Sequence, residues 1–414
     1  MGQVKTQVKG RVMGLNGNEA VAWAVKQCNV DLVAAYPITP QTIIVEKFSE
    51  FVANGEVHTE FVPVESEHSA MSACVGAAAT GARAFTATAA NGLALMWEIL
   101  YIAASLRLPI VMAVTNRALS APINIHCDHS DTMGARDSGW IQLYVEDPQE
   151  AYDTTIQAFK IAEHPDVLLP VMVNLDGFFL SHTLQDVHIL PDEVVKEFVG
   201  TRKPIEVYVP YLGKKVPLKL DPEYPLTFGP LDLYDYYFEH KMHQIEAMKN
   251  AKRVIKEVNE EYAKISGRKY GNGLVVPYGL EDAEVAIVVL GSTGGTVRYV
   301  AKKLRKEGYK VGVLRIRAFR PFPVEDVVEL LRRVKVVGVM DRSVSFGARG
   351  GPVFLEVRSA FYDEKEKPII VNYIYGLGGR DAPPSLIESI YKELLRIAET
   401  GKVEQLIKYV GVRE

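Results

Sequence analysis

The chain has 414 residues, of which 48% are hydrophobic and 24% are charged, a composition typical of a soluble globular protein with two or three domains. Its formal net charge of −4 gives no general reason to expect a nucleic-acid or membrane partner. No run of 18 apolar residues is present, so we expect no membrane span. The polar start Met1–Lys5 is unlike a signal peptide, and we expect a cytoplasmic protein.

The cysteine content excludes an iron–sulfur cluster on this chain. Only Cys28, Cys74 and Cys127 are present, far apart and without a CxxC pair. A cluster or a structural zinc site takes about four ligands, usually in close-spaced pairs. We therefore expect these three residues to be small buried apolar side chains.

The first 180 residues alternate between apolar strands and helical segments. Helix starts are indicated by Asn18 as an N-cap for a helix to Gln27, by Pro40 at a first helical position, and by Ser66 as the N-cap of a small-residue helix. The predicted strands are 31–36, 60–64, 82–89, 110–115 and 169–174. Strands that alternate with helices imply a parallel sheet covered on both faces.

After residue 200 the pattern is interrupted by six prolines up to Pro230, and 236–265 then predicts one long amphipathic helix. A second α/β unit begins at Glu284. Its predicted strands are 285–290, 311–316, 334–340 and 369–375, and its predicted helices are 297–307 and 385–400. We predict an α/β fold of two three-layer αβα domains with mainly parallel sheets. The expected divisions are a domain at 1–235, a helical linker at 236–282 and a domain at 283–414.

Two motifs, YPITP at 36–40 and VESEHSA at 64–70, each end a predicted strand and open a helix. Such segments lie at the carboxyl edge of a parallel sheet, where ligands bind. The second motif places Glu67 in the first turn of a helix of small residues. Glu67 could simply complement the helix dipole. Alternatively, a carboxylate buried beside a bound heterocycle could share a proton with a ring nitrogen.

Arg117 follows the strand at 110–115 and should reach the same edge. Its guanidinium suits bidentate binding of a substrate carboxylate, or an internal ion pair with Asp128 or Asp131. Thr39 could donate its hydroxyl to the same substrate carboxylate, or cap the helix that begins at Pro40.

Two further clusters are weaker candidates. His126, Asp128, His129 and Asp131 have loop spacing without an HExxH pattern, which favours a hydrogen-bonded loop over a metal site. The loop Gly291–Thr296 could bind a phosphate through helix N-terminal amides. It matches neither GxGxxG nor GxxxxGK[ST], however, and a tight strand-to-helix turn is favoured.

Taken together, several motifs resemble the α subunits of 2-oxoacid:ferredoxin oxidoreductases, with the pyruvate enzyme as the most similar form. They are YPITP, VESEHSA, ATAANGLALM, VTNRALSAPINIHCDHSD, LGSTGGTV and RPFP. The resemblance covers nearly the whole chain. It implies an N-terminal domain that binds the aminopyrimidine half of thiamine diphosphate, followed by a domain similar to the C-terminal domain of transketolase.

The resemblance implies oxidative decarboxylation of pyruvate with coenzyme A to acetyl-CoA and CO2. Glu67 would hydrogen-bond the aminopyrimidine as the catalytic residue, with Pro37 and Ile38 beside the cofactor. Thr39 and Arg117 would hold the substrate. His126 stands where some members have an apolar or aromatic residue near the substrate, which leaves 2-oxoisovalerate, 2-oxoglutarate and aryl glyoxylates as alternatives.

The chain lacks both GDG followed by Asn and a ferredoxin-type cysteine run. The resemblance therefore implies partner subunits: a β subunit that holds the diphosphate and Mg²⁺, a γ subunit, and a ferredoxin-like δ subunit. The [4Fe–4S] clusters would lie on partners, and electrons would pass through them to ferredoxin. A non-catalytic scaffold subunit remains the alternative from a different functional class.

Overall fold

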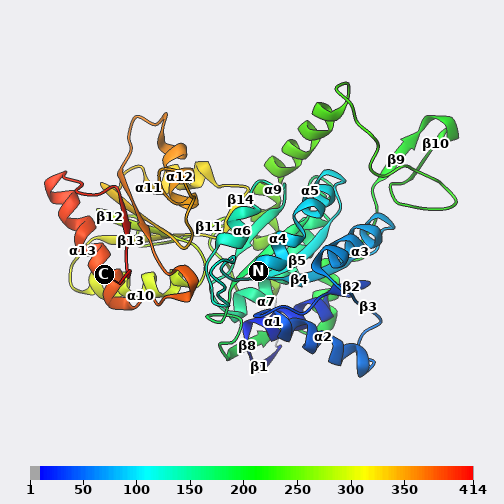
Figure 1. Ribbon diagram of the computed structural model, residues 1–414, viewed down its shortest axis with the longest axis horizontal. Coiled ribbons are helices and arrows are strands. Elements are labelled where there is room, and N and C mark those ends of the chain that lie inside the picture. Colours follow the sequence, from blue (N-terminus) through cyan, green and yellow to red (C-terminus); the bar gives the residue numbers. More distant parts are fainter. Residues whose placement is uncertain (1–9, 414) are drawn as a thin grey trace, which may run out of the picture.

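The computed structural model describes residues 10–413 and contains two α/β units joined by the long helix α9 (Tyr237–Ser266) (Figure 1). The start Met1–Lys5 lies outside the described residues. The first sheet has seven strands in the order β14-β6-β7-β5-β4-β2-β3, parallel except for β14. These strands are β2 (Leu32–Ala35), β3 (Glu60–Pro63), β4 (Ala84–Thr88), β5 (Ile110–Asn116), β6 (Ile141–Tyr144), β7 (Val171–Asp176) and β14 (Ala318–Arg320).

Helices cover both faces of this sheet because successive strand side chains point to opposite faces. On β5, Val111 and Ala113 join the apolar cluster beneath α1 (Gly17–Gln27), α2 (Thr42–Ala53) and α7 (Pro148–Ala162). Met112 and Val114 join the cluster beneath the opposite helices. Those helices are α3 (Glu67–Ala79), α4 (Ala90–Leu95) and α5 (Trp97–Ser105).

The second sheet has six strands in the order β11-β13-β12-β15-β16-β17, with β11 antiparallel. They are β11 (Val275–Tyr278), β12 (Val285–Val289), β13 (Val311–Ile316), β15 (Val336–Asp341), β16 (Ile369–Ile374) and β17 (Ile407–Tyr409). One face packs on α10 (Thr293–Lys306) and α13 (Pro384–Thr400), and the other on α11 (Val324–Leu331) and α12 (Pro352–Phe361). The predicted fold class, two three-layer αβα units with mainly parallel sheets, is confirmed.

The two units share one apolar cluster. It includes Ala113 of the first sheet, Val288 of the second sheet and Val254 of α9. In addition β14, which follows the second unit's β13 in sequence, pairs with β6 of the first sheet. The sequence did not predict this exchange, because a three-residue strand carries almost no periodicity.

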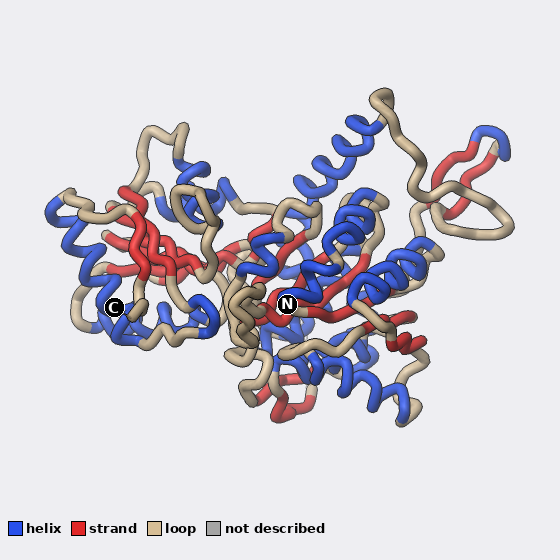
Figure 2. The backbone as a smooth tube through the Cα atoms, viewed as in Figure 1, coloured by secondary structure: helices blue, strands red, loops and turns tan. Residues whose placement is uncertain are grey.

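Smaller elements lie outside the two sheets. β1 (Arg11–Leu15) pairs antiparallel with β8 (Gln185–Ile189). A hairpin formed by β9 (Glu206–Val209), η1 (Pro210–Leu212) and β10 (Lys214–Pro217) extends away from the body (Figure 2). The remaining short helices are α6 (Ser130–Gly134), α8 (Asp192–Val199) and η2 (Leu377–Gly379). Among the residues 10–413, no helix combines the length and apolarity that a membrane crossing requires.

Three predicted helix starts are wrong, and one of them is that of α10, which begins at Thr293 and not at the predicted Val297. The N-cap of α1 is Asn16, not Asn18: Asn16 Oδ1 accepts from the Glu19 N–H at 2.9 Å, and Glu19 accepts from the Asn16 N–H in return. This capping box satisfies two otherwise free amides, while buried Asn18 donates to the Pro40 carbonyl at 2.7 Å. Helix α2 begins at Thr42, two residues after Pro40. The predicted cap of α3 is confirmed, since Ser66 accepts from the Ser69 N–H.

Candidate active site

Four neighbouring strands end at one edge of the first sheet, and the predicted site residues follow them. Arg117 follows β5, helix α4 begins after β4, Pro37–Thr39 follow β2, and Glu67 opens α3 after β3. Because β5, β4, β2 and β3 are adjacent in this order, their carboxyl ends form a continuous rim. The fold thus places the predicted residues along one edge, as the βα pattern indicated.

The Glu67 side chain is buried beneath the start of α4. It is 6% exposed, and no hydrogen bond from another described residue reaches its carboxylate. A Cβ atom on Gly92 would lie 2.6 Å from Glu67 Oε1 and 2.5 Å from Thr88 Oγ1. The Glu67 carboxylate oxygen and the Thr88 hydroxyl oxygen therefore both face the backbone of Gly92, which carries no side chain. The Thr88 hydroxyl is fully buried and has no partner within the described chain. Buried polar atoms without partners are costly, and these oxygens suit a ligand with polar ring atoms.

Asp131 connects the ends of β4 and β5, a role that the sequence did not reveal. Its Oδ2 accepts from the Ala90 N–H at 3.1 Å and from the Arg117 N–H at 3.0 Å. Ala90 has a φ of +43°, a strained conformation for a residue with a Cβ, which the Asp131 carboxylate helps to hold. Burial raises the pKa of Asp131. The hydrogen bonds from Asn116 and from these amides lower the pKa in part, but burial has the larger effect. An aspartate in a polar loop gives no sequence signal for such a role.

The Arg117 guanidinium is buried and contacts carbonyls, not acids. Its Nη1 donates to the Thr39 carbonyl at 3.0 Å, and its Nε donates to the Asn124 carbonyl at 2.9 Å. The alternative of an ion pair with Asp128 or Asp131 is wrong, because the Arg117 guanidinium contacts neither carboxylate. Arg117 reaches Asp131 through its backbone N–H alone. The Thr39 side chain is exposed, and α2 has no side-chain cap, so the capping alternative for Thr39 is also wrong. A buried guanidinium without a carboxylate can bind an anion.

The other predicted site residues lie nearby. His126 is exposed, with its ring centroid 5.0 Å from that of Phe178. The next residue contacts the second unit, since the Gly379 N–H donates to the Cys127 carbonyl at 2.6 Å. Pro37 is exposed and Ile38 is half-buried. The roles of these three residues toward a ligand stay predictions.

A buried polar network joins the two units behind this rim. Asp176, at the end of β7, lies 2.7 Å from His129 Nε2 and 3.1 Å from Arg342 Nη1. It also accepts from the N–H of Ser292 at 3.1 Å and from its hydroxyl. Ser292, in the tight turn between β12 and α10, therefore uses its amide and its hydroxyl to bind a protein carboxylate, in agreement with the interpretation as a structural turn, and Thr293–Thr296 form the first turn of α10.

The same network contains a possible metal-ligand trio. The ligand atoms of Cys127, His129 and Asp176 all lie within 4.8 Å of one another. The guanidinium of Arg342 beside Asp176 opposes a second cation there. Burial alone would raise the pKa of Asp176, but His129 and Arg342 together bring it well below its usual range. Asp128, which lies between Cys127 and His129 in the sequence, accepts hydrogen bonds from the Ser130 N–H and from the Gly378 N–H. Hydrogen bonds therefore organise this segment.

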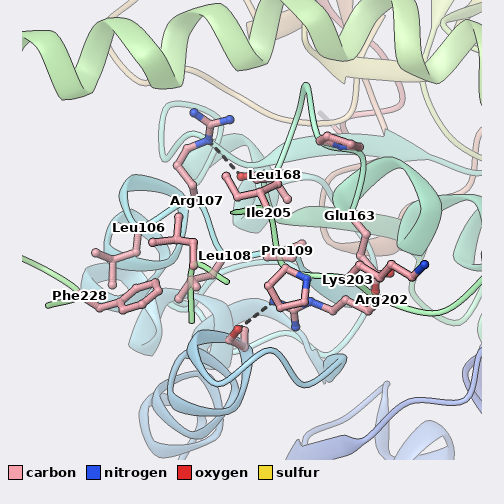
Figure 3. Close-up of a pocket in the computed structure, with 14 residues that line it drawn as sticks. Leu106, Arg107, Leu108, Pro109, Glu163, Leu168, Arg202, Lys203, Ile205 and Phe228 are labelled. Atoms are coloured by element: carbon pink, nitrogen blue, oxygen red, sulfur yellow. Dashed lines mark hydrogen bonds between the residues drawn. The ribbon is translucent and has the colours of Figure 1, made fainter. Parts of the chain in front are cut away.

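A cavity of about 230 Å³ lies at the opposite edge of the sheet, near the start of β5 (Figure 3). Its guanidiniums serve structural roles. Arg107 donates to the Leu168 carbonyl at 3.1 Å, and Arg202 donates to the Ala78 carbonyl in the last turn of α3 at 2.8 Å. Glu67 does not line this cavity, which is therefore separate from the candidate site.

Comparisons with known proteins identify the family of this chain. The family profile described as "Pyruvate flavodoxin/ferredoxin oxidoreductase, thiamine diP-bdg" matches residues 23–260. A second profile, "Pyruvate:ferredoxin oxidoreductase core domain II", matches residues 283–387. The chain belongs to the pyruvate flavodoxin/ferredoxin oxidoreductase family.

The curated relatives are similar over nearly their full length. "Pyruvate synthase subunit PorA" of Thermotoga maritima is 58% identical over 97% of this chain and 98% of its own. The protein of the same name from Methanocaldococcus jannaschii is 52% identical over 97% of this chain and 98% of its own. "Ketoisovalerate oxidoreductase subunit VorA" of Pyrococcus abyssi is 44% identical over 96% of this chain and 98% of its own.

A solved structure shares the fold. The 2-oxoglutarate:ferredoxin oxidoreductase from Magnetococcus marinus superposes with a TM-score of 0.72 at 23% identity, covering 93% of this chain and 65% of that chain. At this identity the likeness supports the fold alone.

Proposed function

We propose that this chain is the α subunit of a pyruvate:ferredoxin oxidoreductase. The enzyme would convert pyruvate and coenzyme A to acetyl-CoA and CO2 and pass two electrons to ferredoxin. The family match supports the reaction class, and the greater identity to pyruvate synthase subunits than to a ketoisovalerate subunit supports pyruvate as the substrate.

The observation that carries the proposal is the buried Glu67 carboxylate, which no other residue of 10–413 hydrogen-bonds and which faces the bare backbone of Gly92. These residues fit the aminopyrimidine half of thiamine diphosphate, whose ring nitrogens need a hydrogen-bonding partner. When bound, thiamine diphosphate supplies the electron sink for loss of CO2 from a 2-oxoacid. The task of Glu67 is to hold a proton at its carboxylate toward a ring nitrogen, with Pro37 and Ile38 beside the ring.

Substrate binding is assigned to the neighbouring loop. The guanidinium of Arg117 has no acidic partner among the described residues, and it is anchored to the Thr39 carbonyl. Together with the exposed Thr39 hydroxyl it would hold the carboxylate and keto oxygen of the 2-oxoacid. His126 would line the side of the substrate pocket that faces Phe178.

This chain supplies half of the proposed site. Its three cysteines are buried and separate, and its sequence lacks the GDG signature. We propose that a β subunit holds the diphosphate and Mg²⁺, that a γ subunit and a ferredoxin-like δ subunit complete the enzyme, and that the [4Fe–4S] clusters lie on these partners.

The test is Glu67→Gln in the reconstituted complex. We expect kcat to fall about 10²-fold or more, in line with the loss of a proton-transfer group. Glu65→Gln is the matched control, because Glu65 is exposed two residues before Glu67 and its loss should leave kcat within about twofold. Full activity of the Glu67→Gln complex would instead favour a non-catalytic scaffold subunit.

The second test concerns the substrate. Rates should be compared for pyruvate, 2-oxoisovalerate, 2-oxoglutarate and an aryl glyoxylate with the same complex. We expect kcat/KM to be highest for pyruvate. A higher value for any of the other three would keep the family assignment and change the substrate.

A further inference from the structure

His126 is held in one position although its side chain is exposed. Its carbonyl accepts from the Ala118 N–H at 3.0 Å, and its own N–H donates to Asn124 Oδ1 at 2.7 Å. The Arg117 guanidinium donates to the carbonyl of the same asparagine at 2.9 Å. These hydrogen bonds fix the His126 backbone beside Arg117, to which the carboxylate of the 2-oxoacid was assigned above.

The second unit presses bare backbone against the loop that carries His126. In η2, Gly379 has a φ of +81°, and a Cβ atom on it would lie 2.3 Å from His126 Cβ. A Cβ atom on Gly378 would lie 2.5 Å from Asn124 Nδ2, which donates to the Gly378 carbonyl at 3.0 Å. So close an approach requires glycine at both positions. Gly378 and Gly379 therefore form one side of a clamp on His126.

The Phe178 ring forms the other side of the clamp. Its centroid lies 5.0 Å from that of the His126 imidazole and 4.7 Å from that of His182. Rings at these separations pack against each other. Phe178 is half-buried between the two exposed histidines, so the His126 imidazole is backed by two further rings.

The backbone of Phe178 is strained and firmly held. Its φ is +61°, which a bulky residue rarely adopts. The Phe178 N–H donates to Ser181 Oγ at 2.8 Å, and the N–H of the preceding Gly177 donates to the Asn116 carbonyl at 3.1 Å. A Cβ atom on Gly177 would lie 2.9 Å from Pro40 Cγ, so this segment also packs directly on the YPITP motif. Strain of this kind persists only where the surrounding structure fixes it, and it is found mostly at functional sites.

We propose that Phe178 and Gly379 are positioning residues for His126. Together they hold its imidazole as a wall of the substrate pocket, and this wall admits only 2-oxoacids with a small side chain. This assignment rests on the proposed function, in which Arg117 holds the substrate carboxylate and His126 lines the pocket. A wall that cannot retreat discriminates against one extra methylene group by about 10- to 200-fold. The choice of substrate thus depends on residues of both units.

The test compares kcat/KM for pyruvate with kcat/KM for 2-oxoisovalerate in the reconstituted complex. The ratio of the two does not depend on how much of the complex is correctly folded, so a loss of stability alone leaves it unchanged. Phe178→Ala frees the imidazole, and we expect the preference for pyruvate to fall at least about tenfold. Phe178→Tyr keeps the ring and should retain most of the preference. Tyr362→Ala is the control, because it removes an exposed aromatic side chain at the end of α12 and should leave the ratio unchanged.

A pair of glycine variants tests the side of the clamp that the second unit supplies. Gly379→Ala and Gly401→Ala place alanine at φ values of +81° and +67°, so both variants carry backbone strain. Only the added methyl of Gly379→Ala meets His126, since nothing lies within 4 Å of a Cβ atom on Gly401. Gly379→Ala should change the substrate ratio at least about threefold, as a displaced pocket residue would. Gly401→Ala should leave the ratio unchanged.

A double variant separates positioning from direct contact. If Phe178 acts through His126, the variant with both His126→Ala and Phe178→Ala should have the same ratio as His126→Ala alone. Equal losses of kcat/KM for both substrates in Phe178→Ala, or independent effects of the two substitutions on the ratio, would overturn the proposal. An unchanged ratio in His126→Ala would also overturn it. Wild-type activity on pyruvate supports the proposed function whichever way these ratios fall, so the two can fail separately.

Discussion

Arg342 Nη1 lies 3.1 Å from Asp176 Oδ2, and both side chains are buried. Asp176 ends β7 of the first sheet and Arg342 follows β15 of the second, so this ion pair joins the carboxyl edges of the two units. The loop that carries His126 and Cys127 is held in the same place, because the His129 N–H donates to the Arg342 carbonyl at 2.8 Å.

Loss of the Asp176 charge should destabilise the chain. Asp176→Asn leaves the Arg342 guanidinium buried without its counter-ion, and we expect the free energy of unfolding to fall by about 3 kcal/mol. Urea unfolding at pH 7 measures this change. Glu404→Gln, at the exposed pair with Arg396, should cost less than about 1 kcal/mol. Equal effects of the two substitutions would contradict the prediction.

The same ion pair should make stability sensitive to acid. The folded pKa of Asp176 is lowered by His129 and Arg342 despite burial, whereas the unfolded value is about 3.9. The stabilisation is therefore fully present above about pH 5 and is lost as pH falls toward the folded pKa. The difference in unfolding free energy between wild type and Asp176→Asn should shrink below about pH 4. If this difference in unfolding free energy grew as the pH fell, the predicted direction of the pH dependence would be wrong.

Gly92→Ala should displace the Glu67 carboxylate. The added methyl would lie 2.6 Å from Glu67 Oε1 and 2.5 Å from Thr88 Oγ1, well inside van der Waals contact. We expect kcat of the complex to fall by at least about tenfold while the chain remains folded. Gly76→Ala in α3 is the matched control, because nothing lies within 4 Å of its added Cβ. It should keep activity and add up to about 1 kcal/mol of stability. Similar activities of the two variants would refute this role for Gly92.

Arg117→Met should weaken substrate binding more than turnover. Loss of the guanidinium removes the proposed carboxylate contact, and KM for pyruvate should rise by a factor that corresponds to about 2–4 kcal/mol. Steady-state kinetics of the complex separate KM from kcat. Arg333→Met removes an exposed arginine of the second unit and should leave both constants unchanged. An unaltered KM in Arg117→Met would place the substrate elsewhere.

The sequence predicted the features that depend on regular periodicity. The strand at 110–115 appears as β5, the helix at 236–265 as α9, and the cap at Ser66 is in place, because each rests on a local pattern of apolar or capping residues. Asn18 was mistaken for the cap because Asn16, two residues earlier, offers the same side chain and also has Glu19 in the correct position.

The sequence alone could not predict contacts between residues that are far apart along the chain. Asp131 binds the amides of Ala90 and Arg117 from the separate short helix α6, and Thr88 and Gly92 meet Glu67 only through the packing of α4 on α3. Adjacency of β2, β3, β4 and β5 could be expected from the βα pattern, and this brought Glu67 and Arg117 to one edge. Their exact partners depend on tertiary contacts that no single segment encodes.

The crossing of β14 into the first sheet has a practical consequence for dissecting the protein. A fragment that stopped before residue 318 would leave β6 with an open edge of unpaired amides and carbonyls, and would also uncover the apolar face shared with the second unit. Such an edge invites intermolecular strand pairing. Separately produced halves should therefore precipitate or require co-expression, although the two sheets look like independent modules.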